Sequence, residues 1–388
     1  MLAAGYIRES GARAAVSVGA LVTAVALFTA LVIMIHSFRE SVTFWLDHTL
    51  RGDLFLRTRL SVVNLYKDPL PPEITEALKN MEGPYDLVPN RTFLVQHGGF
   101  PLQFVGMNFK TFFRHCRFLY IDKIDDAEKL LLSGKGVAVS EVFTAKTGLG
   151  VGDALKTQIL GTVITKPIVA VFRDYRTRGG IAYYSLPHLQ DDLNDPSWSE
   201  VRFFFRNAEG KSHDPTDGEL SALERAVINL AGDRVDIIRG KILKAAILKV
   251  FDETFAITGV LLLIAITVAA LGITTTLTIL IWERSAQFST LLAVGADKAQ
   301  IRGIIFWEAV VIVIMGEWGG LLCGFILSWL LVYVINHQSF GWTFIYKVDW
   351  YALALSFPLI IITALGASLP AVRTVFRIPP ATLLRQNR

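Results

Sequence analysis

The chain has 388 residues, of which 52% are hydrophobic and 19% are charged, and its formal net charge is +4. A soluble domain carries roughly 25% charged residues, so part of this chain is expected to lie outside water. The small net charge gives no reason to expect a nucleic-acid partner, and the two cysteines provide no disulfide framework.

Four apolar runs are long enough to cross about 30 Å of hydrocarbon. The transmembrane helices that they predict cover residues 14–36, 250–282, 303–335 and 351–369. The first run follows Arg8 and Arg13, as the apolar core of a signal peptide does, but it exceeds the ~7–15 residues of such a core. An uncleaved anchor is therefore favoured over a cleaved signal.

Basic residues at the helix ends predict the orientation of the four helices. They gather in residues 1–13, in the connector of residues 283–302 and in residues 370–388, whereas the loop of residues 336–350 carries a single lysine. Both termini and the connector are therefore expected to be cytoplasmic. The large segment of residues 37–249 is then periplasmic or extracellular.

The large segment has the pattern of a mixed α+β domain. Strands are predicted at Leu54–Thr58, Thr92–Gln96, Leu102–Met107, Gly136–Val139, Val163–Phe172, Gly180–Tyr184 and Val201–Phe205. Helices are predicted at Pro72–Met81, Asp125–Ser133, Glu141–Gly148 and Gly218–Leu230, the last one with a capping box formed by Thr216 and Glu219. The expected fold is thus an α-helical membrane protein with four transmembrane helices and an α+β extracytoplasmic domain inserted between the first two.

The stretch Arg239–Phe255 has apolar residues at helical spacing and lysines elsewhere, which predicts an amphipathic helix. No glycine or proline separates it from the second transmembrane run. We therefore expect one long helix from the outer domain into the membrane, which would couple the two mechanically. The alternative is a surface helix with a kink at the membrane interface.

The third transmembrane run has two different faces. Small residues recur every fourth position at Gly316, Gly320, Gly324 and Ser328, which favours close packing against another helix. Trp307, Trp318 and Trp329 form a stripe on the other side, which we expect to face lipid. Glu317 lies on the sector of the small residues. Its carboxyl group is either a functional polar element at the permease interface or a protonated group bonded to a threonine of residues 274–276.

The connector has the features of a short amphipathic helix on the membrane surface. Phe288 and Leu291 give it an apolar face, and Gly295 can end it in a left-handed conformation. The run from Glu283 to Ala296 follows the pattern E-R-x-x-E-I-G-x-L-x-A-x-G-A, with departures at residues 287–289 and 292.

Further motifs occur in the same order as in a known family. P-A-x-R begins at Pro370, and P-A-x-L-L-R begins at Pro380. In the outer segment, V-S at Val139 is followed by G-x-G-x-G-D, and R-D-Y at Arg173 is followed by Gly179–Gly180. Together with the connector, these motifs resemble the FtsX-like permease family, which includes the membrane subunits of MacB-type and lipoprotein-releasing ABC transporters.

The resemblance implies a permease subunit of the bacterial inner membrane whose connector docks onto a cytoplasmic ABC ATPase. The residues expected to make this coupling are Glu283, Arg284, Phe288, Leu291 and Gly295. An ordinary interfacial loop helix is the alternative. The chain has no G-x-x-x-x-G-K-[ST] phosphate loop and no metal-ligand spacing, so ATP is expected to be bound by the partner, and this chain is expected to hold no cofactor and to be no enzyme.

The resemblance also implies a second permease chain, in a homodimer or a heterodimer, and contact with membrane lipids. The stretch Tyr6–Arg51 resembles the start of the second module of ten-helix YbbP-like members, so a complete permease and one half of a larger permease both stay open. Two other functions remain as alternatives. One is a non-transporting scaffold that activates a periplasmic cell-wall hydrolase, and the other is a stand-alone membrane sensor.

Overall fold

The computed structural model describes residues 11–59, 61, 63, 66, 68–176, 179–283, 287–288, 290–291, 294–355, 358 and 362. The chain forms two compact units. We call the first the helical unit; it comprises Met1–Phe38, Asp252–Ile335 and Ile345–Arg388. We call the second the sheet unit; it comprises Arg39–Phe251 and Asn336–Phe344.

The long helices are α2 (Gly11–His48), α9 (Gly240–Glu283) and α11 (Lys298–Trp329), which a π-helical turn at Leu330–Ile335 and α12 (Asn336–Phe340) follow. The shorter helices are α3 (Pro72–Lys79), α4 (Phe109–His115), α5 (Ala127–Leu132), α6 (Glu141–Thr147), α7 (Leu186–Leu193) and α8 (Asp217–Ala231). The strands are β1 (Leu54–Thr58), β2 (Tyr85–His97), β3 (Phe100–Met107), β4 (Tyr120–Lys123), β5 (Val137–Ser140), β6 (Ala154–Ile159), β7 (Thr162–Phe172), β8 (Ile181–Ser185), β9 (Glu200–Phe205) and β10 (Val235–Arg239).

Two helices among the described residues are long and apolar enough to cross a membrane, namely Val18–His48 and Ala299–Ser339. They correspond to the first and third predicted runs. The second predicted run lies within α9. The fourth, residues 351–369, lies largely outside the described residues.

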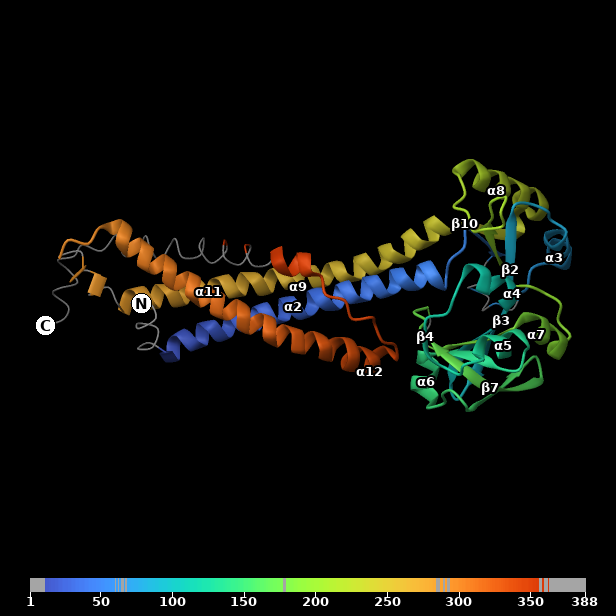
Figure 1. The fold of residues 1–388 in the computed structure, drawn as a ribbon, viewed down its shortest axis with the longest axis horizontal. Helices are drawn as coiled ribbons and strands as arrows, with labels where there is room; N and C mark the ends of the chain where they lie inside the picture. Colours follow the sequence, from blue (N-terminus) through green and yellow to red (C-terminus); the bar gives the residue numbers. More distant parts are fainter. Residues whose placement is uncertain are drawn as a thin grey trace. The chain divides into compact units, whose positions relative to one another are not determined.

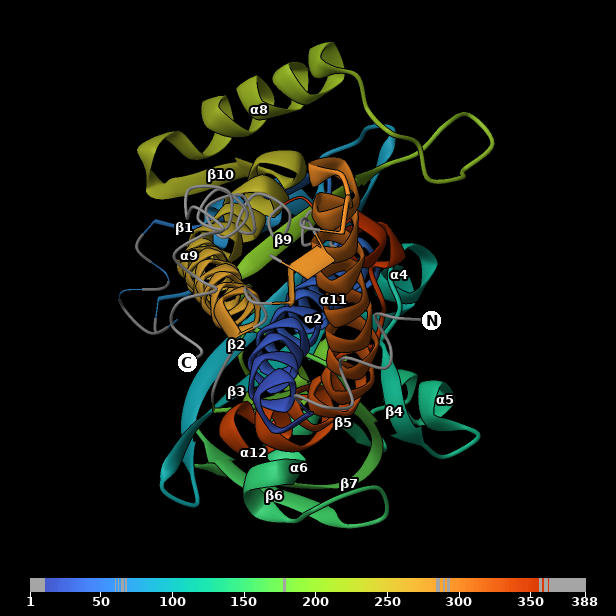
Figure 2. The ribbon, with the colours of Figure 1, turned by 90° about the vertical axis from the view of Figure 1, so that its left-hand side faces the viewer.

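The long helices extend beyond the apolar runs that predict them. α2 continues to His48, twelve residues past the predicted end of the first run, because Val42, Trp45 and Leu46 are buried and stabilise the extra turns by packing. α9 runs without interruption for 44 residues, so the prediction of one long helix is confirmed. The ribbons of α2 (blue) and α11 (orange) cross in Figure 1 and lie next to each other in Figure 2.

The sheet unit contains one ten-stranded mixed sheet in the order β10-β1-β9-β2-β3-β8-β5-β7-β4, with β6 paired to β7. Most neighbours are antiparallel, and β3–β8 and β5–β7 are parallel. Helices α3 and α8 pack on the part of the sheet around β1 and β9. Helices α4 and α5 share a second core, and α6 and α7 share a third with β6 and β7. The predicted α+β class of this unit is therefore confirmed.

All predicted strands and short helices of the sheet unit occur. The strands β4, β6 and β10 and the helices α4, α7 and α12 were not predicted. Strand β2 begins at Tyr85, seven residues before its predicted start, and includes Pro89. The capping box at the start of α8 is confirmed, because the Thr216 N–H donates to the Glu219 carboxylate at 2.7 Å and the Glu219 N–H donates to the Thr216 hydroxyl at 3.3 Å.

Candidate functional site

The small residues of α11 face α2. The Cβ of an alanine at each of the three glycines among them would lie 2.3 to 2.6 Å from a side chain of α2, which leaves no room for a larger residue. The pairs are Gly316 with Leu21, Gly320 with Val25 and Gly324 with Thr29. The residue numbers of the glycines on α11 and of their partners on α2 increase in the same direction, so the two helices run parallel.

Two polar side chains of α11 are buried on the same sector as these glycines. Ser328 is fully buried, and its hydroxyl lies 2.7 Å from the Tyr346 hydroxyl. Glu317 is 1% exposed, so its carboxyl group lies inside the helix packing of this chain. The tryptophan stripe is on the outside, with exposures of 54% to 67% at Trp307, Trp318 and Trp329.

The connector is described at only some of its predicted coupling residues. Phe288 is 5% exposed, so it packs against this chain, whereas Leu291 is 42% exposed and remains accessible to a partner. Arg284 and the side chain of Glu283 lie outside the described residues.

Gly295 ends the connector helix with a left-handed cap. Its φ is +102°, a value that residues with a Cβ rarely adopt. The Ala296 N–H donates to the Leu291 carbonyl at 2.9 Å, the six-to-one bond of a Schellman motif. The glycine is therefore needed for backbone reasons, because nothing lies within 4 Å of an added Cβ.

We define the neck as residues 47–53 and 239–244, where the chain enters and leaves the sheet. Strands β1 and β10 pair antiparallel there. The Gly240 N–H donates to the Asp53 carbonyl at 2.9 Å. A Cβ at Gly240 would lie only 1.8 Å from the Gly52 carbonyl oxygen, so only glycine permits this approach.

The end of α2 is held by residues of the sheet unit. The Arg117 N–H donates to the His48 carbonyl at 2.9 Å, and the Arg202 guanidinium donates to the Thr49 carbonyl at 3.1 Å. Arg202 is 1% exposed, so its charge lies buried at the negative end of the helix. These bonds satisfy carbonyls that a helix end leaves without an internal partner.

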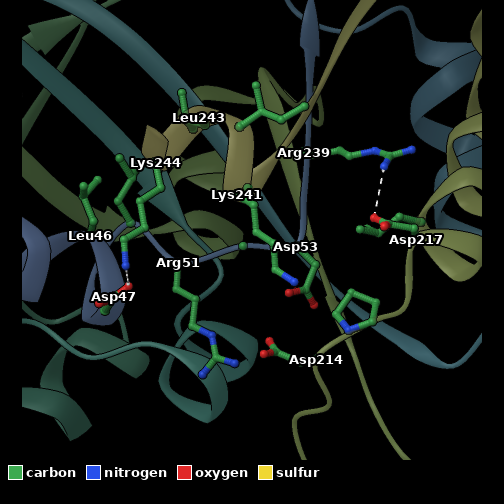
Figure 3. A pocket seen from close by; sticks show the side chains of 16 residues that line it. Leu46, Asp47, Arg51, Asp53, Asp214, Asp217, Arg239, Lys241, Leu243 and Lys244 are labelled. Atoms are coloured by element: carbon green, nitrogen blue, oxygen red, sulfur yellow. Dashed lines mark hydrogen bonds and ion pairs between the residues drawn. The ribbon is translucent and has the colours of Figure 1, made fainter. Parts of the chain in front are cut away.

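A pocket of about 380 Å³ opens at the neck (Figure 3). Its walls carry Asp47, Asp53, Asp214 and Asp217 together with Arg51, Arg239, Lys241 and Lys244. Apolar contacts come from Leu46, Leu50, Leu220, Ile242 and Leu243. The pocket thus combines both signs of charge with an apolar surface.

Two of the cationic side chains that line the pocket form ion pairs. Lys244 forms an ion pair with Asp47, and Arg239 forms one with Glu224 at 2.7 Å. Burial raises the pKa of Asp53, although the Phe205 N–H, which donates to its carboxylate at 2.7 Å, acts in the opposite direction. The Asp53 carboxylate therefore bonds the sheet backbone from a site where its ionised form is disfavoured.

The neck and its pocket were not predicted from the sequence. The lysines of Arg239–Phe255 were recognised as the polar face of a helix, but the Asp47 partner of Lys244 lies 197 positions earlier in the chain. One signal was available in the sequence, because α2 directly precedes the inserted domain and α9 directly follows it. The end of α2 and the start of α9 therefore adjoin the first and last strands of that domain.

Among the described residues, the chain combines two helices that are long and apolar enough to cross a membrane with an α+β sheet unit that lies between them in the sequence. Residues 259–380 match the family model described as FtsX-like permease C-terminal. This part of the chain is therefore similar to the C-terminal domain of FtsX-like permeases, the family that the sequence motifs resemble.

A curated relative is an uncharacterised ABC transporter permease protein of Mycobacterium tuberculosis (strain ATCC 25618 / H37Rv). It is 26% identical over 346 residues, which are 87% of this chain and 39% of the relative. The chain therefore spans about two fifths of that relative's length.

Two solved structures are also similar. The periplasmic region of MacB from Actinobacillus actinomycetemcomitans is 11% identical with a TM-score of 0.34, and covers 50% of this chain and 91% of its own. The extracellular domain of the noncanonic ABC-type transporter YknZ from Gram-positive bacteria is 12% identical with a TM-score of 0.33, and covers 48% and 99%.

Proposed function

We propose that this chain is the permease subunit of an ABC transporter of the FtsX/MacB type, which exports or extracts its substrate by mechanical transmission. A cytoplasmic ATPase binds ATP, docks onto the connector and moves it. The movement passes along α9 to the neck and then to the sheet unit, outside the membrane. A second permease chain and membrane lipids complete the assembly.

The continuity of α9 is the observation that carries this proposal. Its 44 residues give a helix about 66 Å long at about 1.5 Å per residue. A bilayer with its headgroups is only about 45 Å thick, so such a helix reaches beyond the membrane. Because no break interrupts it, displacement at the connector end moves the neck end as well.

The packing of the helices supports the proposed topology. α2 and α11 run parallel, as the first and third helices of a four-helix layout with cytoplasmic termini must. α9 runs antiparallel to α2, since Phe38 contacts Phe255 and Asp47 pairs with Lys244. This alternation supports four transmembrane helices, with the connector on the cytoplasmic side and the sheet unit on the other.

Leu291→Asp tests the coupling. Leu291 is exposed on the connector, so a charge there is expected to leave folding unchanged and to weaken docking of the ATPase. The chain is co-purified with its ATPase and placed in lipid nanodiscs, and ATPase association and ATP turnover are measured. Leu160→Asp is the matched control, because Leu160 is an exposed leucine, at 69%, on the sheet unit.

We expect Leu291→Asp to reduce association at least tenfold and Leu160→Asp to leave it unchanged. Equal association of both variants with the ATPase would contradict docking at the connector. If no ATPase co-purifies with the unmodified chain, the proposed function itself is wrong.

A further inference from the structure

The segment Asn336–Phe344, which we call the strap, belongs to the sheet unit although it follows α11. The Thr343 N–H donates to the Glu141 carboxylate at 3.0 Å. The Tyr175 hydroxyl donates to the Thr343 carbonyl at 3.0 Å. One residue of the strap is therefore bound through both of its backbone polar groups. In Figures 1 and 2, α12 lies beside α6, whose first residue is Glu141.

Aromatic side chains surround these hydrogen bonds. Tyr175 is 5% exposed and lies edge to face with Trp45, with ring centroids 5.8 Å apart. From the strap, Trp342 and Phe344 contact the same tyrosine, with centroids at 5.8 and 6.2 Å. Aromatic pairs of this geometry each stabilise beyond the area that they bury. Burial from water also strengthens the enclosed hydrogen bonds.

The site that receives the strap is built by the outer-domain motifs of the sequence. The Ser140 hydroxyl accepts from the Phe143 N–H and from the Ile181 N–H at 2.9 Å, which joins the start of α6 to β8. Gly180 has φ +95°, and a Cβ there would lie 2.9 Å from the Phe143 Cβ. V-S, R-D-Y and G-G therefore meet around one site.

The strap closes on itself before it docks. The Asn336 amide donates to the Trp342 carbonyl at 2.9 Å, and the Gly341 N–H donates to the His337 carbonyl at 2.8 Å. Gly341 has φ +76°, and its added Cβ would lie 3.4 Å from the Ala145 Cβ on α6. The loop is thus closed by its own hydrogen bonds, and its backbone packs against α6.

We propose that this site on the sheet unit is a docking site for the chain's own strap, and that the docked strap is a third mechanical link to the permease helices. α2 and α9 enter the unit at the neck, and the strap connects it to α11 and to the fourth predicted helix. Movement of those helices then acts on the sheet unit at Thr343. The inference rests on the proposed function, because a link matters only where the helices move.

Docking is measured by a disulfide between Ala145→Cys and Gly341→Cys in the complete complex with its ATPase. The 3.4 Å separation is close to the ~3.8 Å Cβ–Cβ distance of disulfides. Cys323→Ser removes the exposed thiol, and Cys116 can stay, since burial raises its pKa to about 11. Ala145→Cys with Gly210→Cys, in the exposed turn after β9, is the control pair and is expected not to cross-link.

Thr343→Pro tests the hydrogen bond, since proline has no N–H to donate to Glu141. We expect the cross-linking rate to fall about tenfold, as for loss of a hydrogen bond to a charged group. Thr343→Ala keeps the N–H and loses only the 3.4 Å contact of its hydroxyl with Arg173, so its rate is expected to match the unmodified chain. Failure of the Ala145–Gly341 pair to cross-link, or equal rates in both variants, would overturn the docking site.

Transmission is measured as the change in amide exchange of the sheet unit on ATP addition. We expect the change to be lost in Thr343→Pro, kept in Thr343→Ala, and restored when the proline variant carries the closed disulfide. If the proline variant responds like the unmodified chain, the strap is not a link, and the proposed function stands. If the unmodified chain shows no response to ATP, both the strap link and the proposed function are contradicted.

Discussion

Lys244 of α9 donates a hydrogen bond to Asp47 of α2, so an ion pair joins the helices that enter and leave the sheet unit. The pair lies at the wall of the neck pocket (Figure 3). It joins the two helices at the point where both meet the sheet.

Charge reversal at this pair is expected to destabilise the chain slightly. The side chains are 38% and 47% exposed, so the pair contributes only about 0.2–1 kcal/mol. Asp47→Lys places two cations together and should lower the free energy of unfolding by about that amount. Asp47→Lys with Lys244→Asp should restore it. Thermal unfolding of the full chain at low and high salt measures both, and a deficit that persists in high salt would argue against the ion pair.

Gly320→Ala is expected to disturb the packing of α11 on α2. The new methyl group would lie 2.4 Å from Val25, and overpacking of this kind costs about 1–3 kcal/mol. Gly303→Ala is the matched control, because nothing lies within 4 Å of its Cβ in the same helix. Alanine should stabilise position 303 by up to about 1 kcal/mol through helix propensity. Unfolding midpoints in nanodiscs that shift equally for both variants would contradict the small-residue interface.

Gly295→Ala is expected to impair ATP turnover with little effect on the sheet unit. Its φ of +102° costs about 1–3 kcal/mol for a residue with a Cβ, although space around it is open. Gly295→Asn should retain more activity, since asparagine tolerates positive φ better than alanine. ATP turnover of the complex decides the matter, and wild-type turnover in Gly295→Ala would show that the connector does not need this cap.

Asp53→Asn is expected to stabilise the chain at neutral pH. Burial raises the pKa of Asp53 above its usual 3.8, so the folded chain binds this proton more tightly than the unfolded chain. The contribution of Asp53 to stability is therefore full below pH 3.8 and is lost as the pH rises through the raised value. Asparagine keeps an oxygen that can accept from the Phe205 N–H.

The variant should unfold about 1–3 °C higher than the unmodified chain at pH 7, and the two should converge below pH 3.8. Melting curves of the full chain across that pH range measure the effect. A lower midpoint for the variant at pH 7 would mean that the ionised carboxylate is stabilising at this site.

Features that depend on neighbouring residues were predictable from the sequence. The capping box of α8 requires only Thr216 and Glu219, three positions apart. The unbroken α9 follows from helical spacing without glycine or proline. The packing face of α11 follows from the small residues at every fourth position between Gly316 and Ser328.

Features that depend on distant residues were not predictable in the same way. Strand β10 is short and directly precedes α9, and its pairing with β1 joins residues about 180 positions apart. Helix α7 has a proline in its first turn, which marks a helix start only where the following residues pack. The connector contributes Leu291 as its exposed apolar group, while the packing of Phe288 depends on tertiary contacts.

The close approach of Gly240 to Gly52 makes the two ends of the inserted domain neighbours. A domain whose ends meet can be exchanged for another without rebuilding the helices that carry it, as domain insertion generally requires. In this chain a replacement domain would also have to bind the loop around Thr343. Otherwise that loop would have to be replaced together with the domain. Replacement of the domain would therefore require matched changes in the loop around Thr343, because that loop bonds to Glu141 and Tyr175 of the domain.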